Sequence, residues 1–452
     1  MPNKKTQKTV SAENVEERPQ GSNSGLFIRV GIVALLVLYM LKPYLLDKPK
    51  TDENRGQVFA VEGKTMGTYW SALVCASTDQ LLQINNDEEM TSDEEEPIDA
   101  CETLLAKIVQ KRLDFVDSIA STYRADSEIS KFNASDSTDW FDVSPETAEI
   151  VSIAQKVSKN TGGAFDITVA PLVNLYRFGP NKAPLVALPS DEQIDAIKQN
   201  VGYDKLEVRA EPKPGLKKSI PSLTIDLSGV AKGFAADLAG KALEERGLTS
   251  YMLEVGGEIR CRGEKILDPD ADDSKKPKTA PWTLGIEKPA TRPENENERE
   301  APELYRVLRV GSNENAAALA TSGDYRNYRQ VGDVRFSHIL DPRTGKPTEI
   351  VDEGAASKER LGSVSVASSS ADAFSCAEAD AYATGLFVLG AKEGSDLAQK
   401  LGVPALFLVR KDDSAAELVE TSTPAFDALD SKTMDEFLEE KKAEKKEKAN
   451  KK

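Results

Sequence analysis

The pattern of apolar and polar residues along the chain predicts helices and strands in mixed order. Runs typical of strands occupy 68–76, 223–227, 251–255, 258–262, 363–367 and 406–410, and helical periodicity occupies 100–119, 145–161, 230–246 and 371–389. Gly256 and Gly257 separate two of these strands and indicate a hairpin. Because strands and helices alternate without a regular βαβ repeat, we expect an α+β fold, with mixed, largely antiparallel sheets flanked by helices in one compact body.

Two of the expected helices carry capping signals at an end. Gly247 directly follows the helix at 230–246, in the position where a left-handed glycine commonly ends a helix. Ser369 and Asp372 have the spacing of a capping box, so we expect the last long helix to begin near Ala371.

The N-terminal region points to export. Residues 1–25 are polar and predict disorder, and residues 26–46 are largely apolar, with Arg29 and Lys42 near the ends where long basic side chains can snorkel. The uninterrupted apolar core is only about a dozen residues, whereas a full span needs ~20. We interpret 26–46 as an uncleaved membrane anchor, and a cleaved signal peptide is the alternative. Either places the body on the periplasmic or extracytoplasmic side of the inner membrane.

The remaining composition suggests one catalytic body with charged surface segments. We expect a linker at 47–57, a body at 58–421 and a charged C-terminal tail at 422–452. Charged and polar stretches at 85–99, 268–279 and 291–302 bury too little apolar surface to order themselves, so we place them as surface inserts.

Charge and cysteine content exclude two kinds of ligand. The net charge of -17 argues against nucleic acid, which is bound by neutralising phosphates with Lys and Arg. It leaves room for one anionic ligand whose charge a metal ion neutralises locally. The four cysteines form no CxxC pair and the chain has a single histidine, which argues against a structural zinc site.

The last long helix carries the strongest candidate for chemistry. Asp380 and Thr384 are four residues apart and therefore share one helical face, which is otherwise made of small residues. A carboxylate and a hydroxyl one turn apart suit a hard cation such as Mg²⁺. The structural alternative is a threonine bonded to its own helix beside a surface aspartate.

The segment 225–233 is a candidate phosphate site. It runs from an expected strand through the tight turn at Ser228 and Gly229 into a helix, whose first N–H groups favour phosphate, and Lys232 adds a positive charge. The pattern is not that of a P-loop, and an ordinary strand-to-helix turn that binds nothing is the alternative.

The lone histidine is a candidate proton-transfer group. His338 lies three residues before Asp341, in a polar segment that ends in a turn. A structural histidine bonded to a main-chain carbonyl explains the pattern equally well. No nucleophile elbow is present to support a Ser/His/Asp triad.

A glycine-containing segment could hold a flat heterocycle. Gly162 and Gly163 permit close approach of the main chain, and Phe165 and Asp166 follow at once. An ordinary helix exit into a core strand is the alternative.

Taken together, these segments resemble the FAD:protein FMN transferase family, the ApbE-type flavin transferases. The resemblance follows family order and covers nearly the whole body. It rests on segments 63–69, 121–133, 163–168, 171–180, 225–233, 254–258, 321–328, 337–342 and 379–384.

The resemblance implies a set of site residues. Asp380, Thr384 and the main-chain oxygen of Gly229 map onto metal-binding positions. We take Asp380 and His338 as catalytic residues, with His338 the first candidate for the base because it lies beside Asp341 in a family motif. Some relatives carry a second acid where this chain has Ala383. The positions lining the FAD site map onto Met66, Tyr123, Ala164, Phe165, Asp166, Asp226, Lys232 and Leu340.

The resemblance also implies an activity. In this family Mg²⁺ assists transfer of the FMN half of FAD to a threonine hydroxyl of an acceptor protein, in a motif ending in Gly-Ala-Thr, and AMP is released. The expected acceptor is a subunit of a membrane redox complex or an exported flavoprotein. Two alternatives remain: a Mg²⁺-dependent FAD pyrophosphatase that yields FMN and AMP, and a flavin-binding module without catalysis.

Overall fold

The computed structural model describes residues 56–88, 97–180, 183–267, 278–289, 303–311, 316–324, 327–352, 359–368, 375–411 and 417–450. The expected disordered N-terminus at 1–25 and membrane anchor at 26–46 lie outside these residues, as do most of the linker and of the inserts at 268–279 and 291–302. Within the described ranges, no helix is both long enough and apolar enough to cross a bilayer.

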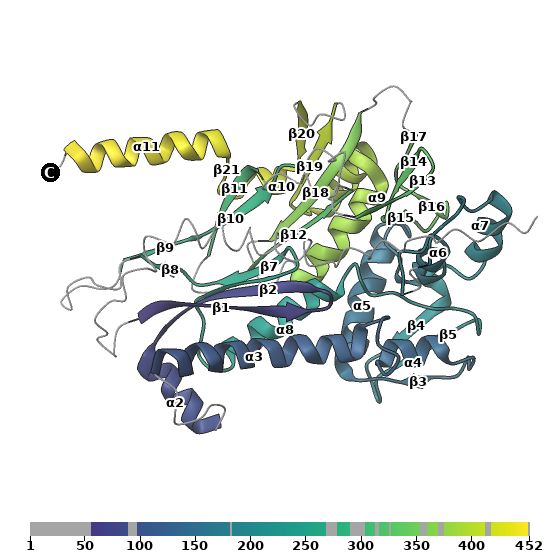
Figure 1. The fold of residues 1–452 in the computed structure, drawn as a ribbon, viewed down its shortest axis with the longest axis horizontal. Coiled ribbons are helices and arrows are strands. Elements are labelled where there is room, and N and C mark those ends of the chain that lie inside the picture. The colour runs from purple at the N-terminus through teal and green to yellow at the C-terminus, as the bar shows by residue number, and fades with distance from the viewer. Residues whose placement is uncertain are drawn as a thin grey trace, which may run out of the picture.

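An eight-stranded sheet forms the centre of the molecule, and each neighbouring pair in it is antiparallel. This confirms the expected mixed fold with antiparallel sheets (Figure 1). In spatial order the strands are β1 (Gly56–Thr65), β2 (Thr68–Ser77), β6 (Tyr251–Val255), β7 (Glu258–Arg262), β12 (Ala317–Gly323), β18 (Arg360–Ser368), β19 (Ala405–Arg410) and β20 (Leu418–Ser422).

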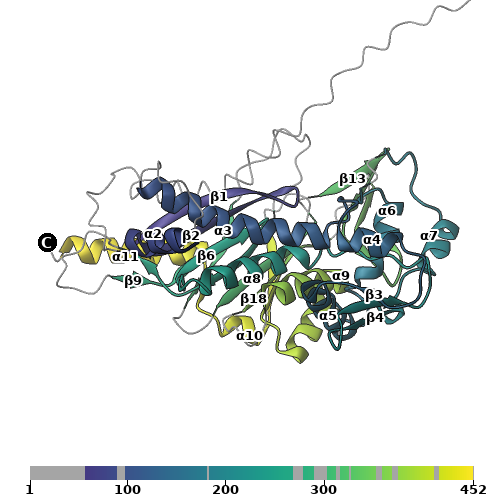
Figure 2. The same ribbon diagram turned by 90° about the horizontal axis from the view of Figure 1, so that it is seen from below.

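Three long helices cover one face of this sheet and pack against one another, as Figure 2 shows from below. They are α3 (Pro97–Ala120), α8 (Ala231–Glu244) and α9 (Cys376–Leu401). The other face packs against a small sheet of β10 (Trp282–Glu287), β11 (Leu304–Val310) and β21 (Ser431–Thr433). Successive side chains of β19 point to opposite faces of the sheet and so contribute to two hydrophobic cores. Phe407 faces the helices, while Leu406 and Leu408 face the small sheet.

The other elements lie around these layers. Three small sheets pair β3 (Phe141–Asp142) and β4 (Leu206–Arg209) with β5 (Gly215–Lys218), β15 (Leu340–Asp341) with β16 (Lys346–Pro347), and β8 (Lys265–Ile266) with β9 (Thr279–Ala280). A further sheet contains β13 (Tyr328–Val331), β14 (Val334–Ser337) and β17 (Ile350–Asp352). The remaining α-helices of the described residues are α2 (Thr78–Glu88), α4 (Glu128–Ala134), α5 (Pro145–Asn160), α6 (Ala170–Leu175), α7 (Asp191–Lys198), α10 (Pro424–Asp427) and α11 (Met434–Asn450).

The close crossing of α8 and α9 depends on a glycine. A Cβ added to Gly233 would lie 2.3 Å from the carbonyl oxygen of Cys376, at the first residue of α9. One turn further along α8, the Asp237 carboxylate accepts hydrogen bonds from the main-chain N–H groups of Cys376 and Ala377, at 3.2 and 3.0 Å. Asp237 therefore caps α9 from another helix.

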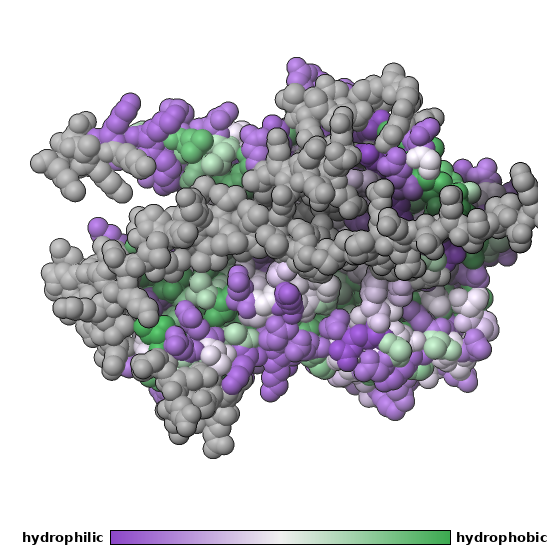
Figure 3. All heavy atoms as spheres, viewed as in Figure 1, coloured by the Kyte–Doolittle hydropathy of each residue, from purple (hydrophilic) through white to green (hydrophobic). Residues whose placement is uncertain are grey.

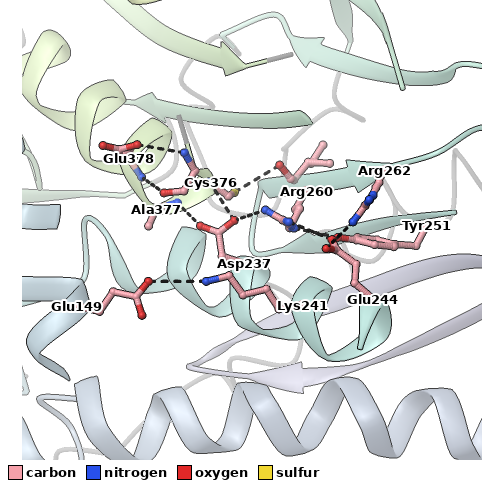
Figure 4. Close-up of polar contacts among 12 residues, drawn as sticks. Glu149, Asp237, Lys241, Glu244, Tyr251, Arg260, Arg262, Cys376, Ala377 and Glu378 are labelled. Carbon is pink, nitrogen blue, oxygen red and sulfur yellow. Dashed lines mark hydrogen bonds and ion pairs between the residues drawn. The ribbon is translucent and has the colours of Figure 1, made fainter. Parts of the chain in front are cut away.

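A buried ion-pair network holds Asp237 in place (Figure 4). Arg260 of β7 donates to the Asp237 carboxylate at 2.8 Å and to Glu244 of α8 at 3.0 Å. The Tyr251 hydroxyl of β6 also donates to Glu244, at 2.5 Å. The network thus joins α8, the β6–β7 hairpin and the first turn of α9.

The packed body extends beyond the boundary expected at residue 421. Phe426 is fully buried, and β21 pairs with β11 of the small sheet. The charged helix α11 leaves the body as an arm, and Glu440 anchors it through ion pairs with Arg309 and, at 3.1 Å, with Lys432. On the face in Figure 3, this arm is mainly hydrophilic, and its apolar side chains gather where it joins the body.

Two expected local structures are wrong. Residues 223–227 form no strand. The side-chain amide of Asn133 forms hydrogen bonds with both the N–H and the carbonyl of Ile225, in the place of a neighbouring strand. The last long helix begins at Cys376 and not near Ala371, with Ser375 as N-cap and Glu378 completing a capping box.

Three further local expectations are confirmed or refined. The hairpin at 251–262 is present as β6 and β7, and the helix ending before Gly247 is present as α8. The ends of the expected insert at 85–99 are helical, because α2 runs to Glu88 and α3 begins at Pro97.

We predict that Gly233→Ala destabilises the protein, although alanine is the better helix former. The added methyl group has no space against α9, and overpacking of this kind costs about 1–3 kcal/mol. Chemical denaturation measures the loss. Lys241→Ala, on an exposed position of the same helix, is the control and should change the free energy of unfolding by less than about 0.5 kcal/mol. Equal stability of both variants would contradict the close crossing.

Candidate active site

Three segments distant in sequence meet at the middle of α9. A Cβ added to Gly229, in the loop before α8, would lie 3.5 Å from the Thr384 hydroxyl oxygen. On the opposite side, the Ser322 hydroxyl at the end of β12 is 2.9 Å from the same oxygen. The hydroxyl of Thr384 therefore lies between the loop and the central sheet.

Asp380 lies one helical turn before Thr384 and is turned inward. Its side chain is 4 % exposed, and one carboxylate oxygen accepts a hydrogen bond from the N–H of Gly233 at 3.1 Å. The expected pairing of Asp380 and Thr384 on one face of a helix is present, and both lie beside the loop and helix start that carry Gly229. The alternative of a solvent-facing aspartate is wrong.

Lys232 links Asp380 to a second carboxylate. Its ammonium nitrogen is 3.5 Å from Asp380 and 3.3 Å from Glu258 of β7. Burial by itself would lower the pKa of Lys232, but the ion pairs with Asp380 and Glu258 outweigh it and hold that pKa above its ordinary value. Lys232 is therefore a fixed positive charge at the start of α8.

Two hairpin tips lie beside Lys232. A Cβ added to Gly256, in the β6–β7 turn, would be 2.8 Å from Thr68 and 3.2 Å from the Lys232 side chain. Thr68 follows the β1–β2 turn, where Met66 has a left-handed φ of 45°. A non-glycine residue in that conformation is uncommon and is often found at functional sites. The structure thus places the Met66 turn next to the charged cluster.

His338 directly follows β14, and it lies close enough to Lys232 for the charge of that lysine to act on its pKa. Its Nδ1 is 2.8 Å from the carbonyl oxygen of Asn327, so Nδ1 carries the proton and Nε2 holds the basic lone pair. Burial lowers the pKa of His338 to about 4, a shift that the bond to Asn327 opposes and the nearby positive charge of Lys232 reinforces. The ring is therefore neutral at physiological pH and able to accept a proton.

Phe178 contacts both His338 and Tyr123. The ring of Phe178 lies edge-on to His338 with centroids 6.2 Å apart, and the Tyr123 hydroxyl donates to the Phe178 carbonyl at 3.2 Å. Tyr123 itself is 58 % exposed. It therefore offers a flat, accessible face on which a heterocycle can stack.

Four of the expected FAD-lining residues turn their side chains into the protein. Ala164, Phe165, Asp166 and Leu340 are all buried. Phe165 packs against Gly229 and Gly385 of α9, where added Cβ atoms would lie 3.1 and 2.9 Å from its side chain. Phe165 therefore packs between α9 and the loop that carries Gly229.

The two aspartates of these segments bond to their own loops. Asp166 accepts hydrogen bonds from the N–H and hydroxyl of Thr168, at 2.8 and 2.7 Å, and burial raises its pKa to about 6. Asp226 accepts from the N–H of Ser228 at 2.9 Å, which shapes the turn before Gly229. Contact of either residue with FAD stays a prediction.

A comparison with known proteins identifies the family of this chain. The family model described as "ApbE family" matches residues 66–407, which span most of the chain. The chain belongs to the ApbE family. This confirms the resemblance found in the sequence.

Curated relatives align with most of this chain. The FAD:protein FMN transferase of Vibrio cholerae is 37% identical over 318 residues, which cover 70% of this chain and 83% of that protein. The FAD:protein FMN transferase of Escherichia coli K12 is 33% identical over 390 residues, covering 86% of this chain and 94% of that protein. With relatives of this name, the chain is a transferase enzyme.

Solved ApbE structures share the fold. The flavin transferase ApbE from Vibrio cholerae matches with a TM-score of 0.61 and 33% identity, over 83% of this chain and 99% of that one. The apo form of the Pseudomonas stutzeri flavinyl transferase ApbE matches with a TM-score of 0.63 and 30% identity, over 84% and 99%.

Two residues of this ApbE site were not singled out from the sequence. Ser322 and Glu258 lie within segments that carry the family resemblance, but neither has a local pattern that marks it as functional. Their positions become meaningful only when β12 and β7 bring them to Thr384 and Lys232. Membership of a matching segment was the only signal that could have found them.

The donor atoms here fit a hard divalent cation. Among the described residues, no three His, Cys, Asp or Glu side chains cluster as metal ligands. A site built from the Asp380 carboxylate, the Thr384 hydroxyl and the Gly229 main chain would not form such a cluster, since it has one acid. Oxygen donors of this kind suit Mg²⁺, which keeps several waters and needs few protein ligands.

We predict that His338 stays neutral well below pH 6.5 in the folded protein. Because it is the only histidine, its ring signals in a ¹⁵N NMR titration need no assignment, and they should titrate near pH 4. In the unfolded chain the same ring should titrate near about pH 6.5. Since the folded pKa is the lower one, stability present above pH 6.5 is lost as the pH falls toward 4. A folded-state pKa close to 6.5 would contradict the described environment.

Proposed function

We propose that this chain transfers the FMN moiety of FAD to a threonine hydroxyl of an acceptor protein and releases AMP, with Mg²⁺ as cofactor. The observation that carries the proposal is the convergence of Gly229, Asp380 and Thr384 beside the charged Lys232. Membership of the ApbE family supports the same reaction.

Asp380, Thr384 and the main-chain oxygen of Gly229 would hold the cation. When bound, Mg²⁺ would neutralise charge on the diphosphate of FAD and on the departing AMP. Lys232 would keep its positive charge at the same place through its pairing with Asp380 and Glu258. Ser322 would orient the Thr384 hydroxyl through their shared hydrogen bond.

His338 is proposed as the general base. The acceptor hydroxyl oxygen forms a bond to the phosphorus of the FMN half while the bond from that phosphorus to the AMP oxygen breaks. The hydroxyl proton passes to Nε2 of His338, whose lone pair is set by the bond from Nδ1 to Asn327. Tyr123, exposed and linked to Phe178, would stack on a ring of the bound FAD.

We further propose an extracytoplasmic location, attached to the inner membrane by residues 26–46, with acceptors that are exported or membrane redox flavoproteins carrying a Gly-Ala-Thr motif. The apolar character of 26–46 supports the location.

Mass spectrometry of an acceptor tests the proposal directly. An acceptor with a Gly-Ala-Thr motif, incubated with the protein, FAD and Mg²⁺, should gain the mass of FMN on its threonine. An acceptor with valine in place of that threonine is the control and should gain nothing. Release of AMP at an equal rate without any acceptor would instead indicate a FAD pyrophosphatase. Tight FAD binding without any turnover would indicate a flavin-binding module.

We predict that Asp380→Ala and Asp380→Asn both abolish Mg²⁺-dependent transfer. The asparagine variant keeps an oxygen that can accept from Gly233, so it separates loss of charge from loss of folding. Asp195→Ala, an exposed carboxylate on α7, is the matched control and should transfer at the original rate. Full activity of either Asp380 variant in excess EDTA would remove the proposed metal site.

We predict that His338→Ala slows transfer by about 10²–10⁴-fold, the usual contribution of a general base. His338→Gln should be slowed similarly, because an amide can imitate the bond to Asn327 but cannot accept the proton. Single-turnover rates at saturating FAD and acceptor measure the effect. A transfer rate close to that of the unaltered protein in either variant would assign the base elsewhere.

A further inference from the structure

A buried lysine outside the candidate active site is surrounded by main-chain oxygens. Lys218, the last residue of β5, is 1% exposed. Its ammonium donates to the carbonyls of Ser135 at 2.7 Å, Leu223 at 3.0 Å, Phe132 at 3.1 Å and Pro221 at 3.4 Å. The nitrogen also lies 4.7 Å from the centroid of the Phe132 ring. This is the coordination expected of an internal cation.

The four carbonyls come from two segments that need a partner. Phe132 and Ser135 lie at the C-terminal end of α4, where the helix dipole is negative. Pro221 and Leu223 begin the extended segment that leads to Gly229 and forms no strand ladder. Lys218 therefore ties the end of α4 to the loop of the active site.

Two further contacts continue this attachment toward the site. The Asn133 side chain of α4 bonds the N–H and the carbonyl of Ile225, each at 2.8 Å. The N–H of Asp226 donates to the carbonyl of Ile167 at 2.7 Å. Beyond them lie the Asp226 turn and Gly229, which meets Thr384. The path from Lys218 to the proposed metal ligands is thus a short, continuous stretch of chain.

We propose that the Lys218 ammonium is a built-in cation that holds segment 221–229 in its binding conformation and so positions Gly229 and Asp226. The inference rests on the proposed function, and it assigns Lys218 as a positioning residue.

The energetics favour such a role. Burying an ammonium is costly unless its N–H groups are satisfied, and burial lowers the pKa of Lys218. The carbonyls and the dipole of α4 offset that cost. Without the ammonium, the carbonyls of Ser135, Pro221 and Leu223 lose this hydrogen bond, and the segment can replace it by moving toward water. The fraction of molecules ready to bind FAD then falls, and the apparent dissociation constant rises in proportion.

Lys218→Met tests the inference because methionine is an unbranched side chain of nearly the same length without the charge. We expect FAD, titrated in the presence of Mg²⁺, to bind at least about tenfold more weakly, as for a tenfold drop in the competent population. Lys217→Met is the matched control: its ammonium pairs at the surface with Glu207 at 3.0 Å. This control should bind FAD within about twofold of the unaltered protein.

Hydrogen exchange gives a readout that needs no flavin. In the FAD-free protein, the amides of 223–229 should exchange faster in Lys218→Met than in Lys217→Met, while those of α3 should be unchanged. If the unaltered protein fails to bind FAD, the proposed function fails, but the exchange result still decides on Lys218.

Chemical rescue separates a cation site from simple packing. Lys218→Ala leaves the carbonyls without a cation, and added methylammonium should restore FAD affinity and protect 223–229 in that variant alone. Should Lys218→Met fail to fold, this rescue decides the matter. A folded Lys218→Met with unaltered FAD affinity and exchange, or a Lys218→Ala that methylammonium does not rescue, would overturn the inference.

Discussion

The interaction on which this site depends is the capping of α9 by a side chain of α8. Asp237 accepts from the first two N–H groups of α9, and Arg260 neutralises its charge below the surface. Gly233, with no side chain, lets the helices approach until its own N–H meets Asp380. These contacts fix the height and rotation of α9, and therefore where Asp380 and Thr384 point. The Gly229 loop, the Lys232 pairing and the Ser322 contact are all arranged around that fixed helix.

The ApbE arrangement combines rigid and adaptable parts. Side chains from α8, α9 and the β6–β7 hairpin are buried and held by hydrogen bonds and ion pairs, whereas Tyr123 and the Met66 turn lie at accessible edges. The Gly229 loop is intermediate in how firmly it is held, because it pairs with no strand. It is held by an amide from Asn133, an ammonium from Lys218 and the packed ring of Phe165. Three side chains thus do for this loop what a neighbouring strand does elsewhere.

The sequence pattern predicted the turns and helices that neighbouring residues determine, but it did not predict the features that depend on contacts between distant segments. The hairpin at 251–262 and α8 with its Gly247 end follow from turn glycines and helical periodicity, and both are present. The strand at 223–227 is absent because Asn133, far away in sequence, takes its hydrogen bonds. In the site, the four-residue spacing of Asp380 and Thr384 was readable, but Ser322 was not, because only the sheet brings it near. Phe165 and Leu340 have apolar side chains that pack inward, which a linear motif does not reveal.

The most direct test of the account is to locate the cation itself. Crystals grown with FAD and Mn²⁺ in place of Mg²⁺ should show one anomalous peak bounded by the Asp380 carboxylate, the Thr384 hydroxyl and the Gly229 carbonyl, with the FAD diphosphate beside it. A peak bound elsewhere, or FAD seated against this face of α9 with no metal peak under conditions that support transfer, would contradict the central claim.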